Sequence, residues 1–232
     1  MIWKEEWKIY KNVFSQSSIK ALEKLSDQGF FIKLKSPISI GKESNIFSAE
    51  TADSDIIAKI FRLENAEFNR MRDYLVADPR YTVVKTGKRP VIFSWTQREF
   101  RNLLIARECI KVPTPIAFKE NIILMELIGS FGKPAPMLKD GYPENPEKFF
   151  NEIVSMIKKL WKHGWVHGDL SGFNILNHEE RPVFIDLSQM TSVKSPRASE
   201  LLQRDVENIC KFFRKDIKRD PSGILESIRL CK

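Results

Sequence analysis

Three oxygen-bearing side chains lie close together in the sequence between Val166 and Gln189. Asp169 is followed five residues later by Asn174, and Asp186 comes at the end of the next apolar run. Carboxylate and amide oxygens suit a hard cation such as Mg²⁺, so Asn174 and Asp186 are candidate metal ligands. Asp169 could accept the proton of an attacking hydroxyl or orient a water. This order of Asp, Asn and Asp is that of the base and metal ligands in kinase-type phosphoryl transfer.

Two short apolar segments must position these side chains. Residues 175–176 and 183–185 predict the strands of a buried hairpin, with 177–182 as its turn. Asp and Asn are also common turn residues, so the spacing alone is compatible with an ordinary loop. The apolar strand that ends at Asp186 favours the catalytic interpretation, because chance does not supply this context.

A second group of candidate residues lies upstream, where the apolar pattern changes to period two. Residues 38–50 read ISIGKESNIFSAE and predict two strands around a tight Gly41-Lys42 turn; IIAKIFRL then predicts a strand that carries Lys59. Backbone N–H groups of this turn, with Lys42 and the Ser44 hydroxyl, could hold phosphate oxygens, and Lys59 would add a point charge. An ordinary hairpin with a snorkelling lysine explains the same residues.

Glu99 is the candidate partner of Lys59. It belongs to a helix predicted over 95–108 and lies near the apolar side of that helix, where a carboxylate needs a partner. A helix Glu paired with a strand Lys is the ion pair of active kinases, and a solvated helix charge is the alternative. Further helices are predicted at 15–28, from about 64 to 75, at 148–163 and around 201–213.

The composition is that of an ordinary globular chain of 232 residues, with 42% hydrophobic and 29% charged residues. The net charge of +8 favours polyanionic partners such as RNA or nucleotide phosphates, although scattered solvated lysines give the same total. Three widely spaced cysteines argue against a disulfide framework and a zinc site, and for a reducing compartment. Without a signal-peptide pattern or a long apolar run, we expect a cytoplasmic protein with no membrane partner.

Together these residues resemble the RIO family of atypical protein kinases, and most of all its first branch in the compact archaeal form. The resemblance runs from about Phe14 to Phe213, through ISIGKESNIF, AKIF, RMRDYLVADPR, WTQREFRNL, ILMELIG, PAPMLKD, VHGDLSGFNIL, FIDLSQ and LLQRDVENI. It implies an α+β, protein-kinase-like fold of two lobes, truncated relative to ordinary protein kinases. The N-terminal lobe, mostly antiparallel sheet with helices, would span 1–128, and the mostly helical C-terminal lobe 129–232. A mobile loop is expected near 78–92.

The resemblance also implies roles for individual residues. Asp169 would be the catalytic aspartate, while Asn174 and Asp186 would hold the metal. Lys59 would contact the phosphates and pair with Glu99. The ATP would further be held by a phosphate-side loop and a hinge strand, which comprise Ser39, Gly41, Lys42, Glu43, Ser44, Asn45 and the backbone groups of Glu126 and Ile128.

The implied function is that of an ATP-dependent serine/threonine protein kinase, an ATPase, or both, with Mg²⁺ or Mn²⁺ as the metal. The partners would be ATP and the RNA and proteins of the maturing small ribosomal subunit. Asp186 could itself accept the γ-phosphate as an aspartyl-phosphate. This chain departs from the common family pattern at Ile40, Gly168 and Gly172, where Gly172 replaces a frequent Glu.

Two other functions fit part of the sequence. HGDL followed by an Asn and a strand-terminal Asp is also the signature of small-molecule kinases of the aminoglycoside and choline kinase type. The GKES loop and the RMRDYLVADPR block argue against that assignment. A non-catalytic basic module that binds pre-ribosomal RNA is the third candidate, although the complete set of charged and amide residues argues for catalysis.

Overall fold

The computed structural model describes residues 14–64, 68–81, 86–130 and 132–230. The chain divides into two compact units, one formed by residues 1–100 and 115–127 and the other by 101–114 and 128–232. Of the segment in which we expected a mobile loop, residues 82–85 lie outside the described residues, and 88–92 are helical.

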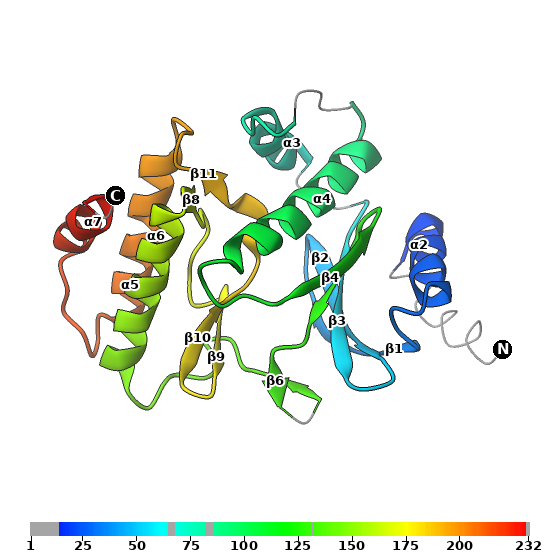
Figure 1. The fold of residues 1–232 in the computed structure, drawn as a ribbon, viewed down its shortest axis with the longest axis horizontal. Helices are drawn as coiled ribbons and strands as arrows, with labels where there is room; N and C mark the ends of the chain where they lie inside the picture. Colours follow the sequence, from blue (N-terminus) through cyan, green and yellow to red (C-terminus); the bar gives the residue numbers. More distant parts are fainter. Residues whose placement is uncertain (1–13, 65–67, 82–85, 131, 231–232) are drawn as a thin grey trace. The chain divides into compact units, whose positions relative to one another are not determined.

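A five-stranded antiparallel sheet forms the centre of the first unit (Figure 1). Alternate residues of the second strand are buried, as its period-two pattern predicts. The predicted antiparallel sheet is thereby confirmed. In spatial order the strands are β1 (Lys33–Ile40), β2 (Ser44–Glu50), β3 (Asp55–Phe61), β5 (Ile122–Glu126) and β4 (Pro115–Lys119).

Helix α2 (Gln16–Asp27) packs on one face of this sheet (Figure 1). The Ser15 hydroxyl caps its start by accepting a hydrogen bond from the backbone N–H of Ser18 at 3.2 Å. Gly29, with a φ of 82°, follows its end, as the sequence predicted. The apolar side of α2 shares a core with the sheet that includes Ala21, Leu22, Leu25, Phe47, Ala58 and Leu124.

Helix α4 (Lys88–Ala106) begins seven residues before the predicted start at Trp95. Pro90 does not prevent the earlier start because it lies in the first turn, where backbone N–H groups have no partner within the helix. The Gly87 carbonyl accepts from the backbone N–H of Val91 at 3.3 Å and closes that turn. A shorter helix, α3 (Phe68–Val76), precedes it.

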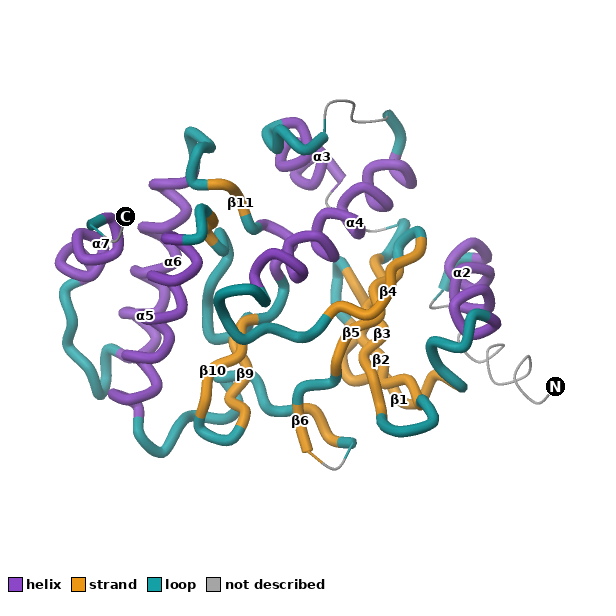
Figure 2. Tube along the Cα trace, viewed as in Figure 1, coloured by secondary structure: helices purple, strands orange, loops and turns teal. Residues whose placement is uncertain are grey.

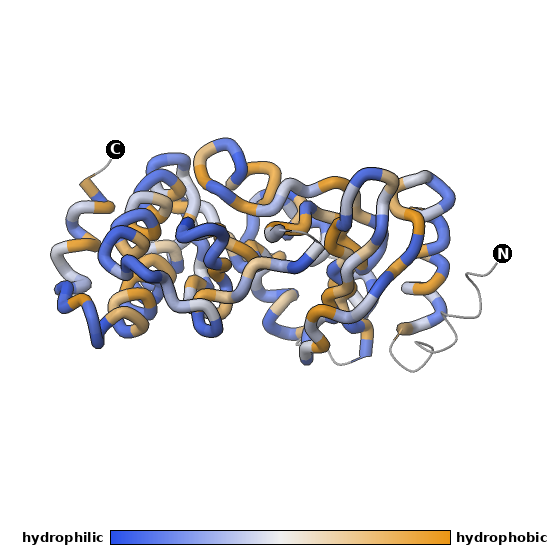
Figure 3. Tube along the Cα trace, turned by 90° about the horizontal axis from the view of Figure 1, so that it is seen from below, coloured by the Kyte–Doolittle hydropathy of each residue, from blue (hydrophilic) through white to orange (hydrophobic). Residues whose placement is uncertain are grey.

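The second unit is mostly helical, as predicted. Helices α5 (Pro146–Lys162), α6 (Ala198–Phe213) and α7 (Pro221–Arg229) contact one another (Figure 2). Hydropathy alternates along these helices, which is typical of helices with one buried side (Figure 3). The short strands are β6 (Gly129–Ser130), β7 (Lys133–Pro134), β8 (Trp165–Val166), β9 (Ile175–His178), β10 (Arg181–Phe184) and β11 (Thr191–Ser192).

The predicted hairpin is formed by β9 and β10, but its turn is shorter than the expected 177–182. Pairing continues out to His178 and Arg181, so the turn contains only Glu179 and Glu180. Both glutamates have positive φ, 53° and 60°, as a type I′ turn requires. The predicted turn was too long because type I′ turns are normally recognised by Asn-Gly or Asp-Gly, and this turn has neither.

We expect the substitution Glu179→Asn to stabilise the fold by about 0.5–1 kcal/mol, because Asn tolerates the left-handed region better than Glu. The weak contact of Glu179 with the Ser130 hydroxyl, 3.4 Å and exposed, costs little to lose. Thermal unfolding followed by circular dichroism should show a melting temperature about 1–4 °C higher. Glu179→Val should lower it, and equal melting temperatures for the two variants would contradict the backbone argument.

Candidate active site

The hairpin brings the two predicted metal ligands to neighbouring positions. Asn174 immediately precedes β9, and Asp186 is the second residue after β10. The Ile185 N–H donates to the Asn174 carbonyl at 3.0 Å. The Asn174 side-chain NH₂ donates to the backbone carbonyl of Asp169 at 2.7 Å and approaches its carboxylate at 3.4 Å. These bonds use the nitrogen of Asn174 and leave its Oδ1 as the atom that could face a cation.

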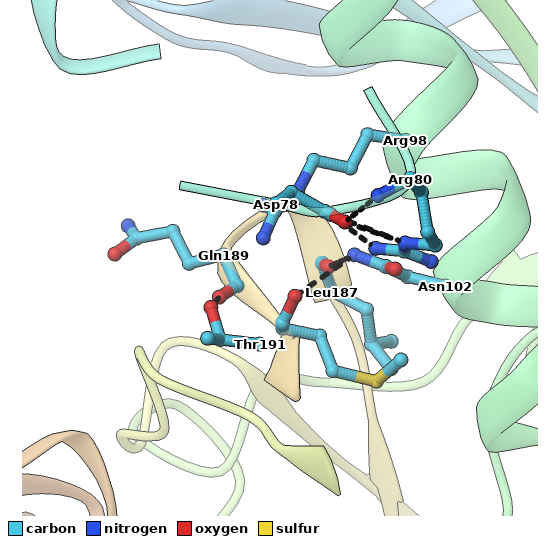
Figure 4. Close-up of polar contacts among 8 residues, drawn as sticks. Asp78, Arg80, Arg98, Asn102, Leu187, Gln189 and Thr191 are labelled. Atoms are coloured by element: carbon cyan, nitrogen blue, oxygen red, sulfur yellow. Dashed lines mark hydrogen bonds and ion pairs between the residues drawn. The ribbon is translucent and has the colours of Figure 1, made fainter. Parts of the chain in front are cut away.

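Asp186 has a left-handed backbone, with a φ of 55°, where the chain enters the 3₁₀ helix η1 (Leu187–Gln189). Asp is one of the few residues other than Gly that adopt this conformation readily. The Asn102 side chain donates to the Leu187 carbonyl at 2.7 Å and so holds the turn that follows Asp186 (Figure 4). Asn102 was not among the predicted site residues, because it comes from α4, 85 positions away.

His167 connects the loop of Asp169 to the end of β10. Its Nε2 lies 3.1 Å from the Ile185 carbonyl, and its Nδ1 accepts from the Asp169 N–H at 3.3 Å. Burial lowers the pKa of His167 to about 4, so the ring is neutral near pH 7, with the proton on Nε2. His167 therefore helps to shape the loop of Asp169. Within the described ranges, no cluster of three His, Cys, Asp or Glu residues offers an alternative metal site.

Helix α6 braces the loop that carries Asp169. The Asp205 carboxylate, 1% exposed, accepts from the backbone N–H groups of Gly168 at 2.7 Å and Leu170 at 2.8 Å. Burial raises the pKa of Asp205 to about 7, while these two donors and Arg204 act in the opposite direction. Arg204 also donates to the Gly168 carbonyl, and Asn208 donates to the Leu170 carbonyl at 3.1 Å.

Asp205 was not among the predicted site residues. Its real partners are backbone groups at least 35 positions away, so no local pattern reveals them. One signal was available, since an acidic residue lies among the apolar positions of LLQRDVENI. A carboxylate on the buried side of a helix needs partners of this kind.

In the first unit, Lys59 and Glu99 form the buried ion pair that the sequence suggested. Lys59 Nζ lies 2.7 Å from Glu99 Oε1, and the two side chains are 7% and 1% exposed. The ammonium also lies 5.1 Å from the centre of the Phe61 ring. Burial makes this pair sensitive to loss of either partner, because the remaining charge would keep its desolvation cost.

The predicted phosphate-side loop is a tight turn between β1 and β2. The Gly41 N–H donates to the Ser44 carbonyl at 3.0 Å, and a Cβ at Gly41 would lie 2.9 Å from that oxygen. Strand pairing places Ser44 opposite Phe61 and Ile46 opposite Lys59, so Ser44 and Lys59 share one face of the sheet. The Glu43 carbonyl accepts a hydrogen bond at 2.8 Å from the backbone N–H of Arg62, the residue after β3. The Lys42 side chain is exposed.

The other residues predicted to contact the nucleotide do not all lie on the face of the sheet that carries Lys59. Asn45 is 1% exposed and shares the face of Phe47, which packs on α2, so its side chain lies on the face opposite Lys59. Ser39 pairs with Ile46 in the sheet. Glu126 ends β5, and the carbonyl of Ile128 already accepts from the Ala135 N–H at 2.8 Å.

A charged network that we did not predict joins the segment after α3 to the middle of α4 (Figure 4). Asp78 accepts from Arg80 at 2.6 Å and from the buried Arg98 at 3.0 Å. Burial raises the pKa of Asp78, but hydrogen bonds from Arg80 and Arg98 outweigh this and hold it below its usual value. The Arg98 guanidinium also lies over the rings of Tyr74 and Trp95. This network anchors the residue next to Glu99.

Comparison with known proteins shows which family the chain resembles. A family model described as the RIO domain matches residues 45–222. RIO-type serine/threonine-protein kinases Rio1 from Haloferax volcanii and Methanocaldococcus jannaschii are each 37% identical over 91% of this chain and 73% of the relative. The Rio1 kinase from Thermoplasma acidophilum is 32% identical over 79% of this chain and 98% of its own length.

A solved structure extends the agreement to the fold. The Rio2 kinase–ADP/Mg²⁺–phosphoaspartate complex from Chaetomium thermophilum gives a TM-score of 0.70 at 25% identity, over 91% of this chain and 65% of that one. A second Rio2 kinase structure from this organism gives 0.73 at 24% identity, over 94% of this chain and 69% of that one.

The fold and the named relatives together define a protein-kinase-like, ATP-dependent phosphotransferase. The chain belongs to the RIO family of serine/threonine kinases. The predicted family, fold class and enzyme activity are confirmed, and the named relatives are protein kinases rather than small-molecule kinases. Within the described residues, no helix is long and apolar enough to cross a membrane.

We expect Lys59→Met to destabilise the protein by about 3–5 kcal/mol, because Glu99 would remain buried without the Lys59 ammonium. The double variant Lys59→Met/Glu99→Leu should recover most of this loss, since neither charge remains. Urea unfolding of Lys59→Met, Glu99→Leu and the double variant measures the coupling free energy between the two side chains. ATP turnover should stay low in all three, and a double variant as unstable as the sum of the single variants would contradict a buried pair.

We expect Asp205→Asn to lower kcat at least about tenfold with a smaller change in the KM for ATP, because Asp205 positions the loop of Asp169. Asn supplies one acceptor where two backbone N–H groups point, so one donor loses its partner, at a cost of about 1–3 kcal/mol. Steady-state kinetics and thermal unfolding separate the two effects. Glu207→Gln, an exposed change on the same helix, is the control and should leave kcat and the melting temperature unchanged. A normal kcat in Asp205→Asn would argue against positioning.

Proposed function

We propose that this kinase transfers the γ-phosphate of ATP through Asp169, Asn174 and Asp186, and that Asp186 itself can accept the phosphate. The observation that supports this most is the pairing of Ile185 N–H with the Asn174 carbonyl, which puts the two oxygen donors at adjacent strand ends. The related Rio2 kinase whose structure contains phosphoaspartate supports the second part.

The donor set fits a hard divalent cation. Asn174 presents Oδ1, because its nitrogen is bound to Asp169, and Asp186 adds a carboxylate. Mg²⁺ prefers such oxygens, and Mn²⁺ can take the same ligands. When bound, the metal would neutralise charge on the transferring phosphoryl group. Asn174 and Asp186 would hold it.

The protein's own residues supply positioning and charge. Asp169 would orient the acceptor hydroxyl or water and take its proton, and its loop is fixed by His167 and Asp205. Lys59 would place a positive charge on the ATP phosphates, and Glu99 holds its ammonium. In the autophosphorylation step, a carboxylate oxygen of Asp186 would bond to the γ-phosphorus while the bond to the ADP oxygen breaks.

We further propose the maturing small ribosomal subunit as the partner and the cytoplasm as the location. The net charge of +8 suits a ribosomal RNA surface. Cys109 and Cys210 are free thiols, and unpaired cysteines fit a reducing compartment. Mutational loss of the kinase with accumulation of unprocessed small-subunit RNA would support the partner.

We expect protein incubated with γ-labelled ATP and Mg²⁺ to acquire a label that hydroxylamine releases, since acyl phosphates are labile to this reagent. Asp186→Asn should abolish the label, and Asp169→Asn should slow its formation while ATP binding, measured by calorimetry, persists. Acid-stable label on serine in the wild type, without a hydroxylamine-sensitive fraction, would contradict the role of Asp186 as acceptor and leave the serine kinase reaction. Equal labelling of wild type and Asp169→Asn would argue against the catalytic role of Asp169.

A further inference from the structure

A basic pocket lies beside the loop that joins Asp169 to Asn174. Its volume is about 410 Å³, and it is formed by that loop, the C-terminal end of α6 and the segment before α5. The backbone N–H of Lys139 donates to the Gly172 carbonyl at 3.0 Å, so the segment before α5 is fixed to the loop. The lining residues are Lys139, Ser171, Gly172, Phe173, Asn208, Lys211, Phe212, Arg214 and Lys215.

The charge of this lining is one-sided. Four of its side chains are exposed cations, and no carboxylate is among the lining residues, although Asp140 just outside pairs with Lys139 at 2.8 Å. A cleft lined by charges of one sign concentrates ligands of the opposite sign. The pocket therefore selects an anionic ligand.

Two aromatic side chains also line the pocket. Phe173 is 62% exposed, which is unusual for a large aromatic side chain, and Phe212 lines the pocket beside Gly172. A Cβ at Gly172 would lie 2.6 Å from Phe212 Cε2, so the ring occupies the space that a side chain at position 172 would need. A lining with both aromatic and cationic side chains fits a ligand that carries both an apolar group and carboxylates.

A protein segment fits these features better than single-stranded RNA. Recognition of RNA of this kind depends on stacking of bases on an open aromatic face. Here Lys139 Nζ already lies over the Phe173 ring, 5.2 Å from its centre. A nucleobase would have to displace this ammonium, whereas a carboxylate would pair with it.

We propose that this pocket binds an acidic segment of the protein that accepts the phosphate. The proposal rests on the proposed function, since it assigns a substrate class to the same site. Ser171, Gly172 and Phe173 are three of the four residues between Asp169 and Asn174. A segment held in the pocket would thus lie beside the catalytic loop, with acidic residues near the serine or threonine that is phosphorylated.

The test uses fluorescence anisotropy with a labelled peptide in which glutamates and a leucine flank one serine. A twin peptide with glutamine in place of glutamate is the ligand control. We expect the acidic peptide to bind at least about tenfold more tightly than its twin, and more weakly as salt rises. Lys211→Glu/Lys215→Glu should remove this preference while the hydrolysis of ATP remains unchanged.

A matched variant controls for overall charge. Lys20→Glu/Lys24→Glu on α2 makes the same charge change at the same spacing, with both lysines exposed, and should retain the preference. Equal loss of binding in the two double variants, or no preference in the wild type, would overturn the proposal. Oligouridine is the RNA probe. If it binds the wild type more tightly than the acidic peptide does, and Lys211→Glu/Lys215→Glu abolishes that binding, the pocket is an RNA site and the proposal is overturned.

The same proteins separate this proposal from the proposed function. Peptide binding does not require phosphoryl transfer, so it decides the docking site even if no label reaches Asp186. Absence of a hydroxylamine-sensitive label with intact peptide selectivity would affect only the acceptor role of Asp186. Phosphorylation of both peptides at equal kcat/KM would overturn the docking site and leave the kinase reaction in place.

Discussion

One buried carboxylate, that of Asp205, holds the loop that carries Asp169. Asp205 accepts hydrogen bonds from the N–H groups of two loop residues, Gly168 and Leu170, on either side of Asp169. Neither bond uses the side chain of Asp169. A loop held through its backbone keeps its conformation without using the functional groups that it presents.

The rest of the site follows from this constraint and from the short hairpin. His167 connects the loop to the end of β10, and the Asn174 carbonyl connects the start of β9 to Ile185. Asn174 and Asp186 thus lie within two residues of the ends of β9 and β10, and α6 holds the loop of Asp169. Regular elements therefore hold the predicted site residues of the second unit through backbone contacts.

Much of the fold was accessible from local sequence patterns. The Ser15 cap, the period-two strands and the apolar faces of α5 and α6 each depend on residues within a few positions, and the structure has them. The Lys59–Glu99 pair was also accessible, because two charges at buried positions on neighbouring elements have few other ways to be compensated.

The missed features depend on contacts that are distant in sequence or on unusual turn residues. Asp205 and Asn102 bind backbone groups 35 to 85 positions away, and Asp78 meets Arg98 across twenty residues. The Glu179-Glu180 turn lacks the glycine that normally marks positive φ. The start of α4 was hidden by Pro90, because a proline is a helix signal only when its position in the first turn is already known.

The contact of Gly172 with Phe212 limits the order in which these two positions can change during evolution. A side chain gained at 172 while the ring is still present would collide with it at 2.6 Å. Replacement of Phe212 by a smaller residue removes this obstacle and leaves only a local void at the partly exposed end of α6. Descent from an ancestor with a larger residue at 172 would therefore pass through glycine first and phenylalanine second, and the reverse route would have to reopen the space before filling it.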